Sequence, residues 1–257
     1  MSKLSPTPQP SSLPCVTLSE QDGVRYLHLD SIWVQGAMRI ARPHAIELDY
    51  VRRMMMWLLW RPMPLGQVGH AVQLGLGAGA LTRFCYQRLG WACTAVEINE
   101  AVIQANYQWF RLPRDEGLKV VCADAADWIG QAEHANTIDA LQVDLYDADA
   151  AGPVYEDAAF YRACFNSLRE GGVMSVNLFG RHASFERNAA HITQAFGADF
   201  VWRIQATREG NTILIATRGV PLPSLDELLS RAHFIQQEWG LKTEKWPHLI
   251  SPVAYGL

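Results

Sequence analysis

The chain has 257 residues, of which 49 % are apolar and 19 % charged, and its formal net charge is −4. A chain of this length and balance can bury a large core as one domain, with or without a small appendage. The negative charge provides no basic field, so we expect no nucleic-acid partner and no binding to an anionic membrane.

The first fourteen residues, MSKLSPTPQPSSLP, contain four prolines and no apolar core. This composition predicts a disordered leader, residues 1–14, and not a signal peptide. The most apolar run, MMMWLLW at 54–60, is too short to cross a bilayer. The five cysteines form no C-x-x-C pair, which is typical of free thiols in a reducing compartment. We therefore predict a cytoplasmic protein.

Residues 16–40 predict two or three short strands, because Asp22-Gly23 is typical of a hairpin turn. Residues 43–62 predict a helix that begins at Pro43 and is closed by Pro62 and Pro64. We expect residues 15–64 to form a small N-terminal region and 65–257 to form the main domain.

From residue 69 onward, strand and helix patterns alternate. The predicted strands are 70–77, 91–99, 117–124, 137–147, 172–180, 200–207 and 211–219. The predicted helices are 80–90, 99–110, 125–132, 153–172 (ended by Gly-Gly), 183–197 and 223–240.

Strand–helix alternation with nearly continuous apolar strands is typical of a parallel sheet that is covered on both faces. The last two predicted strands leave no room for a helix between them, so they must form a hairpin with one antiparallel strand. The sequence therefore predicts an α/β fold with a doubly wound, mostly parallel seven-stranded sheet. This Rossmann-like pattern resembles the class I transferase fold that uses S-adenosylmethionine (AdoMet).

Three glycines, Gly75, Gly77 and Gly79, lie between the first of these strands and its helix. Glycine permits a tight turn there and lets a ligand approach the backbone closely. Glu97 ends the next strand, twenty residues after Gly77, which is the spacing of a carboxylate that accepts from a ribose diol. We interpret the loop and the acid as a nucleoside site; the alternative is an ordinary turn with a surface glutamate.

The third strand of the alternating region ends in Asp124-Ala125. In AdoMet-type folds an acid at this place meets the amino group of adenine, while a neighbouring backbone N–H meets a ring nitrogen. Asp124 could equally cap the helix that follows it. Both interpretations stay open.

The fourth strand ends in VDLYDADAAGP, which contains Asp144, Asp147 and Asp149. Ligands of open parallel sheets bind beyond the carboxyl ends of the strands, near the switch in strand order between the first and fourth strands. Asp144 and Asp147 should therefore emerge beside the glycine loop, whereas Asp149 fits a solvated loop. Paired carboxylates suit a cationic second ligand such as a primary amine, because one can bind it and another can take its proton.

This stretch resembles the V-D-x-x-D-P-x-G-P signature of spermidine synthases, the polyamine aminopropyltransferases. Asp144 and Asp147 fall on its two acids, and Gly152-Pro153 fall on its G-P with two extra residues between. The upstream VQGAMRI, which carries Gln35, is similar to a strand that enters the same site. The glycine loop and the later acids match further landmarks in order, so the resemblance covers about residues 24–217.

The resemblance implies transfer of an aminopropyl group from decarboxylated AdoMet to an amine such as putrescine, with no metal. It makes Asp144 the base and Asp147 an amine anchor, and it places Tyr146 in the amine channel. Tyr50 corresponds to the tyrosine of the family's Y-H-E element. A homodimer with small-molecule partners is also implied. The implied cofactor-binding residues are Gln35, Gly75, Gly77, Gly79, Glu97 for the ribose, and Asp124 with Ala125 for the adenine.

Three departures from the family keep alternatives open, and one of them is a short N-terminal strand region. The family's glycine loop carries an acid where this chain has Ala78, and the Y-H-E element is reduced to Tyr50-Val51-Arg52. One alternative is a methyltransferase that uses ordinary AdoMet on a small acceptor. The other is a non-catalytic nucleoside-binding paralogue. The eight histidines are scattered without carboxylate or cysteine at ligand spacing, so we expect no metal site.

Overall fold

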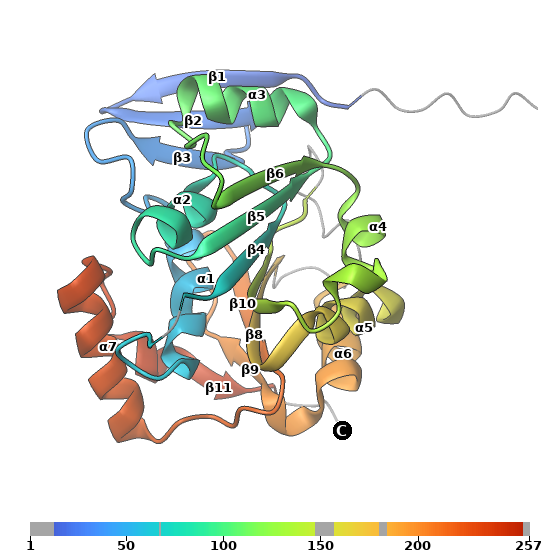
Figure 1. The fold of residues 1–257 in the computed structure, drawn as a ribbon. Helices are drawn as coiled ribbons and strands as arrows, with labels where there is room; N and C mark the ends of the chain where they lie inside the picture. The colour runs from blue at the N-terminus through green and yellow to red at the C-terminus, as the bar shows by residue number, and fades with distance from the viewer. Residues whose placement is uncertain (1–12, 67, 147–156, 180–183, 254–257) are drawn as a thin grey trace, which may run out of the picture.

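A computed structural model of the chain describes residues 13–66, 68–146, 157–179 and 184–253. The described chain contains two sheets, one of three strands and one of eight (Figure 1). The smaller sheet lies above the edge of the larger sheet in this view, next to helix α3 (Glu100–Trp109).

The small sheet is an antiparallel meander of β1 (Val16–Gln21), β2 (Val24–Leu29) and β3 (Gly36–Arg39). Asp22 and Gly23 connect β1 to β2, and both have positive φ, 51° and 73°. Two successive positive φ angles are typical of the type I′ turn, whose twist matches that of a hairpin. The strands predicted for the N-terminal region are therefore confirmed.

The large sheet has the strand order β11-β9-β10-β8-β7-β4-β5-β6. Its strands are β4 (His70–Leu74), β5 (Ala92–Glu97), β6 (Leu118–Cys122), β7 (Ile138–Val143), β8 (Leu168–Phe179), β9 (Val201–Ile204), β10 (Asn211–Thr217) and β11 (Ile250–Pro252). The strands β4 to β8 are parallel, and β10 runs antiparallel to both β8 and β9. The doubly wound sheet and its terminal hairpin are confirmed. The sequence pattern did not predict β11, which adds an eighth, antiparallel strand at the edge.

Strand β4 pairs with β5 on one side and with β7 on the other. The order of the strands therefore reverses beside β4, and a crevice opens at the carboxyl ends of β4 and β7. The predicted switch point between the first and fourth strands of the alternating region lies here.

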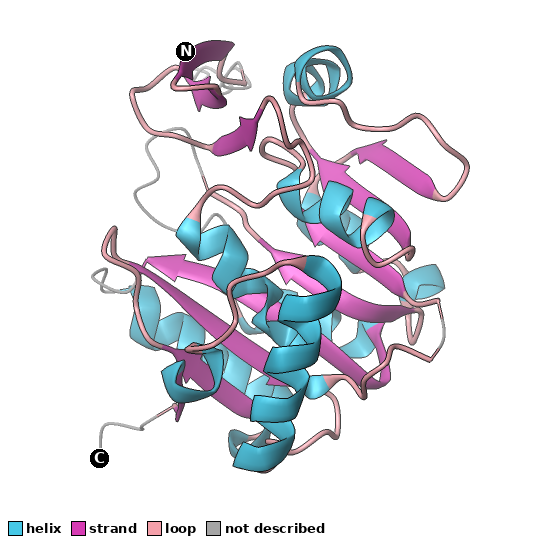
Figure 2. Ribbon diagram, turned by 90° about the vertical axis from the view of Figure 1, so that its left-hand side faces the viewer, coloured by secondary structure: helices cyan, strands magenta, loops and turns pink. Residues whose placement is uncertain are grey.

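Helices cover both faces of the large sheet (Figure 2). The helices α4 (Ala125–Ile129), α5 (Ala158–Ser167) and α6 (Ser184–Phe196) lie on one face, and α1 (Asp49–Met54), α2 (Ala80–Gln87) and α7 (Leu225–Trp239) lie on the other (Figure 1). Each face has its own cluster of buried apolar side chains. Short 3-10 turns occur at η1 (Met55–Trp60), η2 (Ala132–His134), η3 (Ala198–Phe200) and η4 (Trp246–Leu249).

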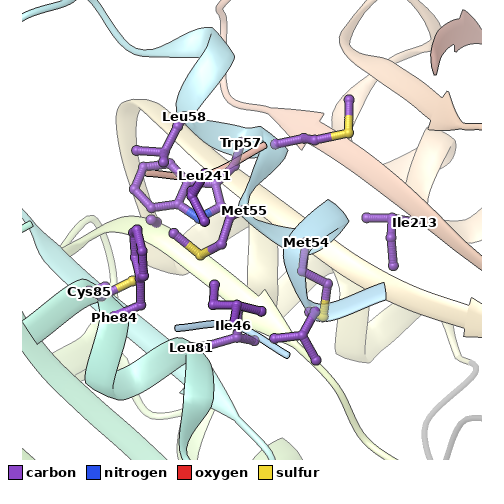
Figure 3. Packing of buried hydrophobic residues seen from close by; sticks show 14 of the residues in the cluster. Ile46, Met54, Met55, Trp57, Leu58, Leu81, Phe84, Cys85, Ile213 and Leu241 are labelled. Carbon is purple, nitrogen blue, oxygen red and sulfur yellow. The ribbon is translucent and has the colours of Figure 1, made fainter. Parts of the chain in front are cut away.

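The helix predicted over 43–62 is wrong at its start and in its second half. The α-helix begins at Asp49, and a 3-10 segment, η1, replaces it from Met55. Every residue of η1 is buried. Its apolar run therefore indicates a segment that is enclosed on all sides, and not the apolar face of an amphipathic helix. Figure 3 shows Met55 and Trp57 packed among side chains of α2 and Leu241. Among the described residues, no helix combines the length and apolarity needed to span a membrane.

The predicted end of the fifth helix at Gly171-Gly172 is also wrong. Helix α5 ends at Ser167, and both glycines lie within β8. Gly171 has φ +77°, and the register between β7 and β8 shifts next to this point. The two glycines therefore lie at an irregularity within the strand. The positive φ of Gly171 favours a residue that lacks a Cβ.

Candidate active site

A cavity of about 710 Å³ lies at the carboxyl ends of the central strands and extends under the loop between β2 and β3. Its volume is in the range of small-molecule sites. The predicted site residues Gln35, Gly75, Gly77, Glu97, Asp124, Ala125, Asp144 and Tyr146 all line it. Residues predicted from separate stretches of the sequence are thus brought to one wall.

The glycine loop joins β4 to α2 at the base of this cavity. Gly75 has φ +85°, and a Cβ there would lie 2.2 Å from the carbonyl oxygen of Asp144. Gly77 has φ +50°, and a Cβ there would lie 2.9 Å from the carbonyl oxygen of Gln35. Because these positions require both left-handed backbone and close approach, the loop can lie directly against the ends of β7 and β3 only with glycine.

Glu97 ends β5 and faces the cavity beside the glycine loop. Its carboxylate accepts hydrogen bonds of 2.9 Å from the backbone N–H groups of Leu76 and Asn99. Burial raises the pKa of Glu97, although these backbone donors oppose the rise. The two donors fix the orientation of a carboxylate that can still accept hydrogen bonds from a ligand hydroxyl.

Asp124 is the N-cap of α4 and also lines the cavity. Its Oδ1 accepts hydrogen bonds from the backbone N–H groups of Ala126, at 2.9 Å, and Asp127, at 3.0 Å. The capping interpretation is confirmed. Contact with an adenine is compatible with this position and stays a prediction.

Asp144 follows β7 at the centre of the cavity wall. Its Oδ1 accepts a hydrogen bond of 2.9 Å from Nδ2 of Asn177, and its Oδ2 accepts one of 3.3 Å from the hydroxyl of Tyr50. Burial raises the pKa of Asp144, against the effect of these two donors. Burial and the nearby carboxylate raise the pKa of Tyr50 well above its ordinary value, so this hydroxyl stays a donor. The arrangement is an oriented carboxylate with increased basicity.

Two amide side chains, those of Asn177 and Asn211, extend this network. Asn177 donates to Asp144, and its Oδ1 accepts from Nδ2 of Asn211 at 3.1 Å. The hydroxyl of Tyr146 donates to the backbone carbonyl of Asn177 at 2.9 Å. Asn211 and Glu209 also line the cavity, and no sequence motif indicated either of them.

The predicted amine anchor, Asp147, lies outside the described residues, as do Asp149 and Gly152-Pro153 of the same stretch. Gln35 lies in the cavity wall immediately before β3, and its backbone N–H donates to the carbonyl of Leu27 at 2.8 Å.

Ala78, where the resembling family has an acid, is buried, at 3 % exposure. A Cβ placed on Gly36 would lie 2.5 Å from the Cβ of Ala78, so the small sheet packs directly against this methyl group. Ala78 therefore packs on β3, and a longer side chain at this position would displace that strand.

The cavity is strongly acidic. Among the described residues, five carboxylates line it, those of Asp49, Glu97, Asp124, Asp144 and Glu209. Of the described residues in its wall, none is a lysine, arginine or histidine. The same part of the chain holds no group of histidine, cysteine and acidic residues that could bind a metal ion. Such a lining suits a ligand with more than one positive charge.

The outer wall of the cavity is apolar and was not predicted. Ile32, Trp33 and Val34, in the loop between β2 and β3, line the cavity and are 89 %, 55 % and 39 % exposed. The sequence pattern predicts strand structure over this run, but β3 begins only at Gly36. An exposed apolar loop at a cavity mouth is available to contact the methylene part of a ligand.

Comparison with known proteins identifies relatives over most of the chain. A polyamine aminopropyltransferase of Neisseria meningitidis is 32 % identical over 237 residues, which are 91 % of this chain and 88 % of that protein. The polyamine aminopropyltransferase of Chromobacterium violaceum is 29 % identical over 238 residues, with the same coverage, 91 % and 88 %. A human eEF1A lysine and N-terminal methyltransferase matches 55 % of this chain and 22 % of its own length at 28 % identity. No protein-family model matches the chain.

Solved structures share the fold. A probable spermidine synthase from Corynebacterium glutamicum superposes with a TM-score of 0.73 at 18 % identity, covering 96 % of this chain and 93 % of that one. Human methyltransferase-like protein 13 in complex with SAH gives 0.65 at 23 % identity, over 82 % and 96 % of the two chains. A spermidine synthase in complex with the transition state analogue AdoDATO gives 0.56 at 16 % identity, over 88 % and 89 %. The predicted class I transferase fold is confirmed.

Proposed function

Because this chain belongs to the polyamine aminopropyltransferase family and is a transferase of the spermidine synthase type, we propose that it transfers the aminopropyl group of decarboxylated AdoMet to putrescine or a similar diamine. The observation that carries the proposal is Asp144, held by Tyr50 and Asn177 in a cavity that contains five carboxylates and no basic side chain among its described residues.

The charge of the cavity supports the decarboxylated donor. This donor carries a sulfonium and an ammonium group, and both positive charges suit a wall of carboxylates. Ordinary AdoMet adds a carboxylate, which would lie among acidic side chains and would find no basic side chain in the described wall. Besides Asp144, four other acids line the described cavity wall, and they compensate for the absence of an acid at Ala78.

The nucleoside part of the donor has a matching wall. We assign its ribose hydroxyls to the carboxylate of Glu97 and its adenine to Asp124 and Ala125, with Gln35 and the glycine loop beside the sulfonium arm. The backbone donors already on Glu97 and Asp124 hold these side chains in place before a ligand enters. The complexes of two structural neighbours with SAH and AdoDATO support a nucleoside thioether in this crevice.

In the proposed reaction the acceptor enters as an ammonium ion and gives a proton to Asp144. The free nitrogen lone pair then attacks the propyl carbon that is bonded to sulfur. The carbon–nitrogen bond forms as the carbon–sulfur bond breaks, and the electron pair goes to sulfur, which leaves as neutral methylthioadenosine. The raised pKa of Asp144 suits it to accept the proton, and Tyr50 and Asn177 orient the carboxylate during the step. We assign Asp147 to anchoring the amine and Tyr146 to its channel.

A methyltransferase is the second candidate. Ala78 and the similarity to the human eEF1A methyltransferase favour it, since that similarity covers 55 % of this chain. A methyltransferase function requires that the protein prefer AdoMet to the decarboxylated donor.

Calorimetric titration with decarboxylated AdoMet, AdoMet and methylthioadenosine tests the proposal, followed by product analysis with putrescine. Tighter binding of the decarboxylated donor and formation of an aminopropylated amine would support it. A preference for AdoMet with methylated product would support the second candidate. Binding without turnover across a panel of amines would indicate a non-catalytic paralogue.

A homodimer and a cytoplasmic location stay predictions. Light scattering can test the first, and fractionation can test the second.

A further inference from the structure

Four of the five carboxylates in the cavity have protein partners. Glu97 and Asp124 accept from backbone N–H groups, and Asp144 accepts from Tyr50 and Asn177. Asp49 pairs with arginines: its Oδ2 lies 2.9 Å from Nε of Arg53, and its Oδ1 lies 3.6 Å from the guanidinium of Arg52. Within the described residues, Glu209 is the carboxylate of the cavity that has neither a hydrogen bond nor an ion pair. Its charge is therefore available to a ligand.

A tight turn fixes the backbone of Glu209 at the cavity. The turn spans 207–210, where the N–H of Gly210 donates to the carbonyl of Thr207 at 3.2 Å. The N–H of Thr207 donates to the carbonyl of Asn211 at 2.8 Å, and its hydroxyl accepts from the N–H of Asn211 at 3.2 Å. Gly210, at φ +104°, supplies the backbone conformation that closes the turn. Glu209 is thus held at the tip of the β9–β10 hairpin.

The position of this hairpin relative to Asp144 follows from the sheet. Asp144 directly follows β7, which neighbours β8, and β8 neighbours β10, which begins at Asn211 after the hairpin turn. The hydrogen bonds from Asn177 to Asp144 and from Asn211 to Asn177 cross these strands in the same direction. Two strand spacings, about 10 Å, separate β7 from β10, and Glu209 lies two residues before β10. A four-carbon diamine with a charge-assisted hydrogen bond at each end can span about this distance.

We propose that Glu209 binds the distal ammonium group of the acceptor and thereby makes the enzyme prefer diamines to monoamines of equal length. The assignment rests on the proposed function, since it takes Asp144 as the partner of the attacking amine. Apolar side chains of the cavity wall, such as Leu48 and Leu145, can contact the methylene chain between the two charged ends. A monoamine would leave the unpartnered carboxylate of Glu209 without a cation.

The test compares 1,4-diaminobutane with 1-aminobutane, which differ only in the distal ammonium. In Glu209→Gln we expect kcat/KM for the diamine to fall by about tenfold, because about this factor corresponds to one partly solvated ion pair in a cavity. For the monoamine we expect a change of less than about twofold. Glu209→Asp should restore part of the preference. Glu244→Gln is the matched control, because Glu244 is exposed and does not line the cavity.

Binding of the two amines to protein saturated with methylthioadenosine gives a second readout that needs no turnover. Equal losses for both amines in Glu209→Gln, or no preference for the diamine in the unchanged protein, would overturn the assignment of Glu209. Absence of aminopropyl transfer to every amine would instead overturn the proposed function. In that case a selective loss of diamine binding in Glu209→Gln would still support the ammonium site.

Discussion

Nδ2 of Asn177 donates a hydrogen bond of 2.9 Å to Oδ1 of Asp144, and this bond links the carboxyl ends of the parallel strands β7 and β8. This donor stabilises the charged form of Asp144, whereas burial raises the pKa of the same carboxyl group. Asn177 thus moderates the basicity of the group that we assign to proton removal.

Asn177→Ala removes this donor and should raise the pKa of Asp144 further. The proposed base works only when deprotonated, so the acidic limb of the kcat/KM profile should move to higher pH. We expect kcat at neutral pH to fall by about tenfold through loss of orientation. Asn166→Ala, on the exposed side of α5, is the control and should leave the profile in place. An unshifted profile in Asn177→Ala would contradict this role of Asn177.

Asp144→Asn keeps the size of the side chain and removes the base. Loss of a general base costs about 10²–10⁴ in rate, so transfer should fall by at least a hundredfold. The affinity for methylthioadenosine should change by less than about threefold, because Glu97 and Asp124 make the assigned nucleoside contacts. Turnover and calorimetric titration of the same preparation measure both quantities. An Asn variant that remains active would remove Asp144 from the mechanism.

The same substitution should change how stability depends on pH. The folded pKa of Asp144 lies above its ordinary value of 3.8, so the folded state holds this proton more tightly than the unfolded state. Its stabilising contribution is present below about pH 3.8 and is lost as the pH rises through the folded value. Relative to the unchanged protein, Asp144→Asn should gain about 1.4 kcal/mol at pH 7 for each unit of that rise. Denaturant unfolding at pH 3.5 and pH 7 measures the difference. A relative stability that is the same at both pH values would show that the carboxyl group is not perturbed.

Gly75→Ala should unfold at lower denaturant concentration than Gly240→Ala. Both glycines have positive φ, 85° and 71°, so both variants pay a similar backbone cost of about 1 kcal/mol. A Cβ at Gly75 would lie 2.2 Å from the carbonyl oxygen of Asp144, whereas a Cβ at Gly240 meets nothing within 4 Å. We expect an additional loss of about 1–3 kcal/mol in the free energy of unfolding for Gly75→Ala. Equal losses would mean that the glycine loop can move away from β7 at no cost.

Local patterns were sufficient for the order of the elements up to β10 and for the residues at the ends of the central strands. Nearly continuous apolar strands alternate with helices, and this alternation alone indicates a parallel sheet. In such a sheet all carboxyl ends meet at one edge, which is why Glu97, Asp124 and Asp144, each at the end of a strand, could be placed together in advance. The glycine loop could be recognised because its function depends on residues that adjoin in the sequence.

Only the tertiary structure decided the partners of these groups. Asn211 reaches Asn177 because β10 pairs antiparallel with β8, and nothing within either segment records that pairing. Surrounding side chains likewise determine the 3-10 segment at Met55–Trp60. They also determine that α5 ends at Ser167 and β8 begins directly after it. Local sequence reports which residues are buried and where the backbone turns, but the contacts of a side chain depend on strands that are distant in the chain. For that reason Glu209, an exposed glutamate in a short turn, became a candidate only once the sheet had placed it beside Asp144's cavity.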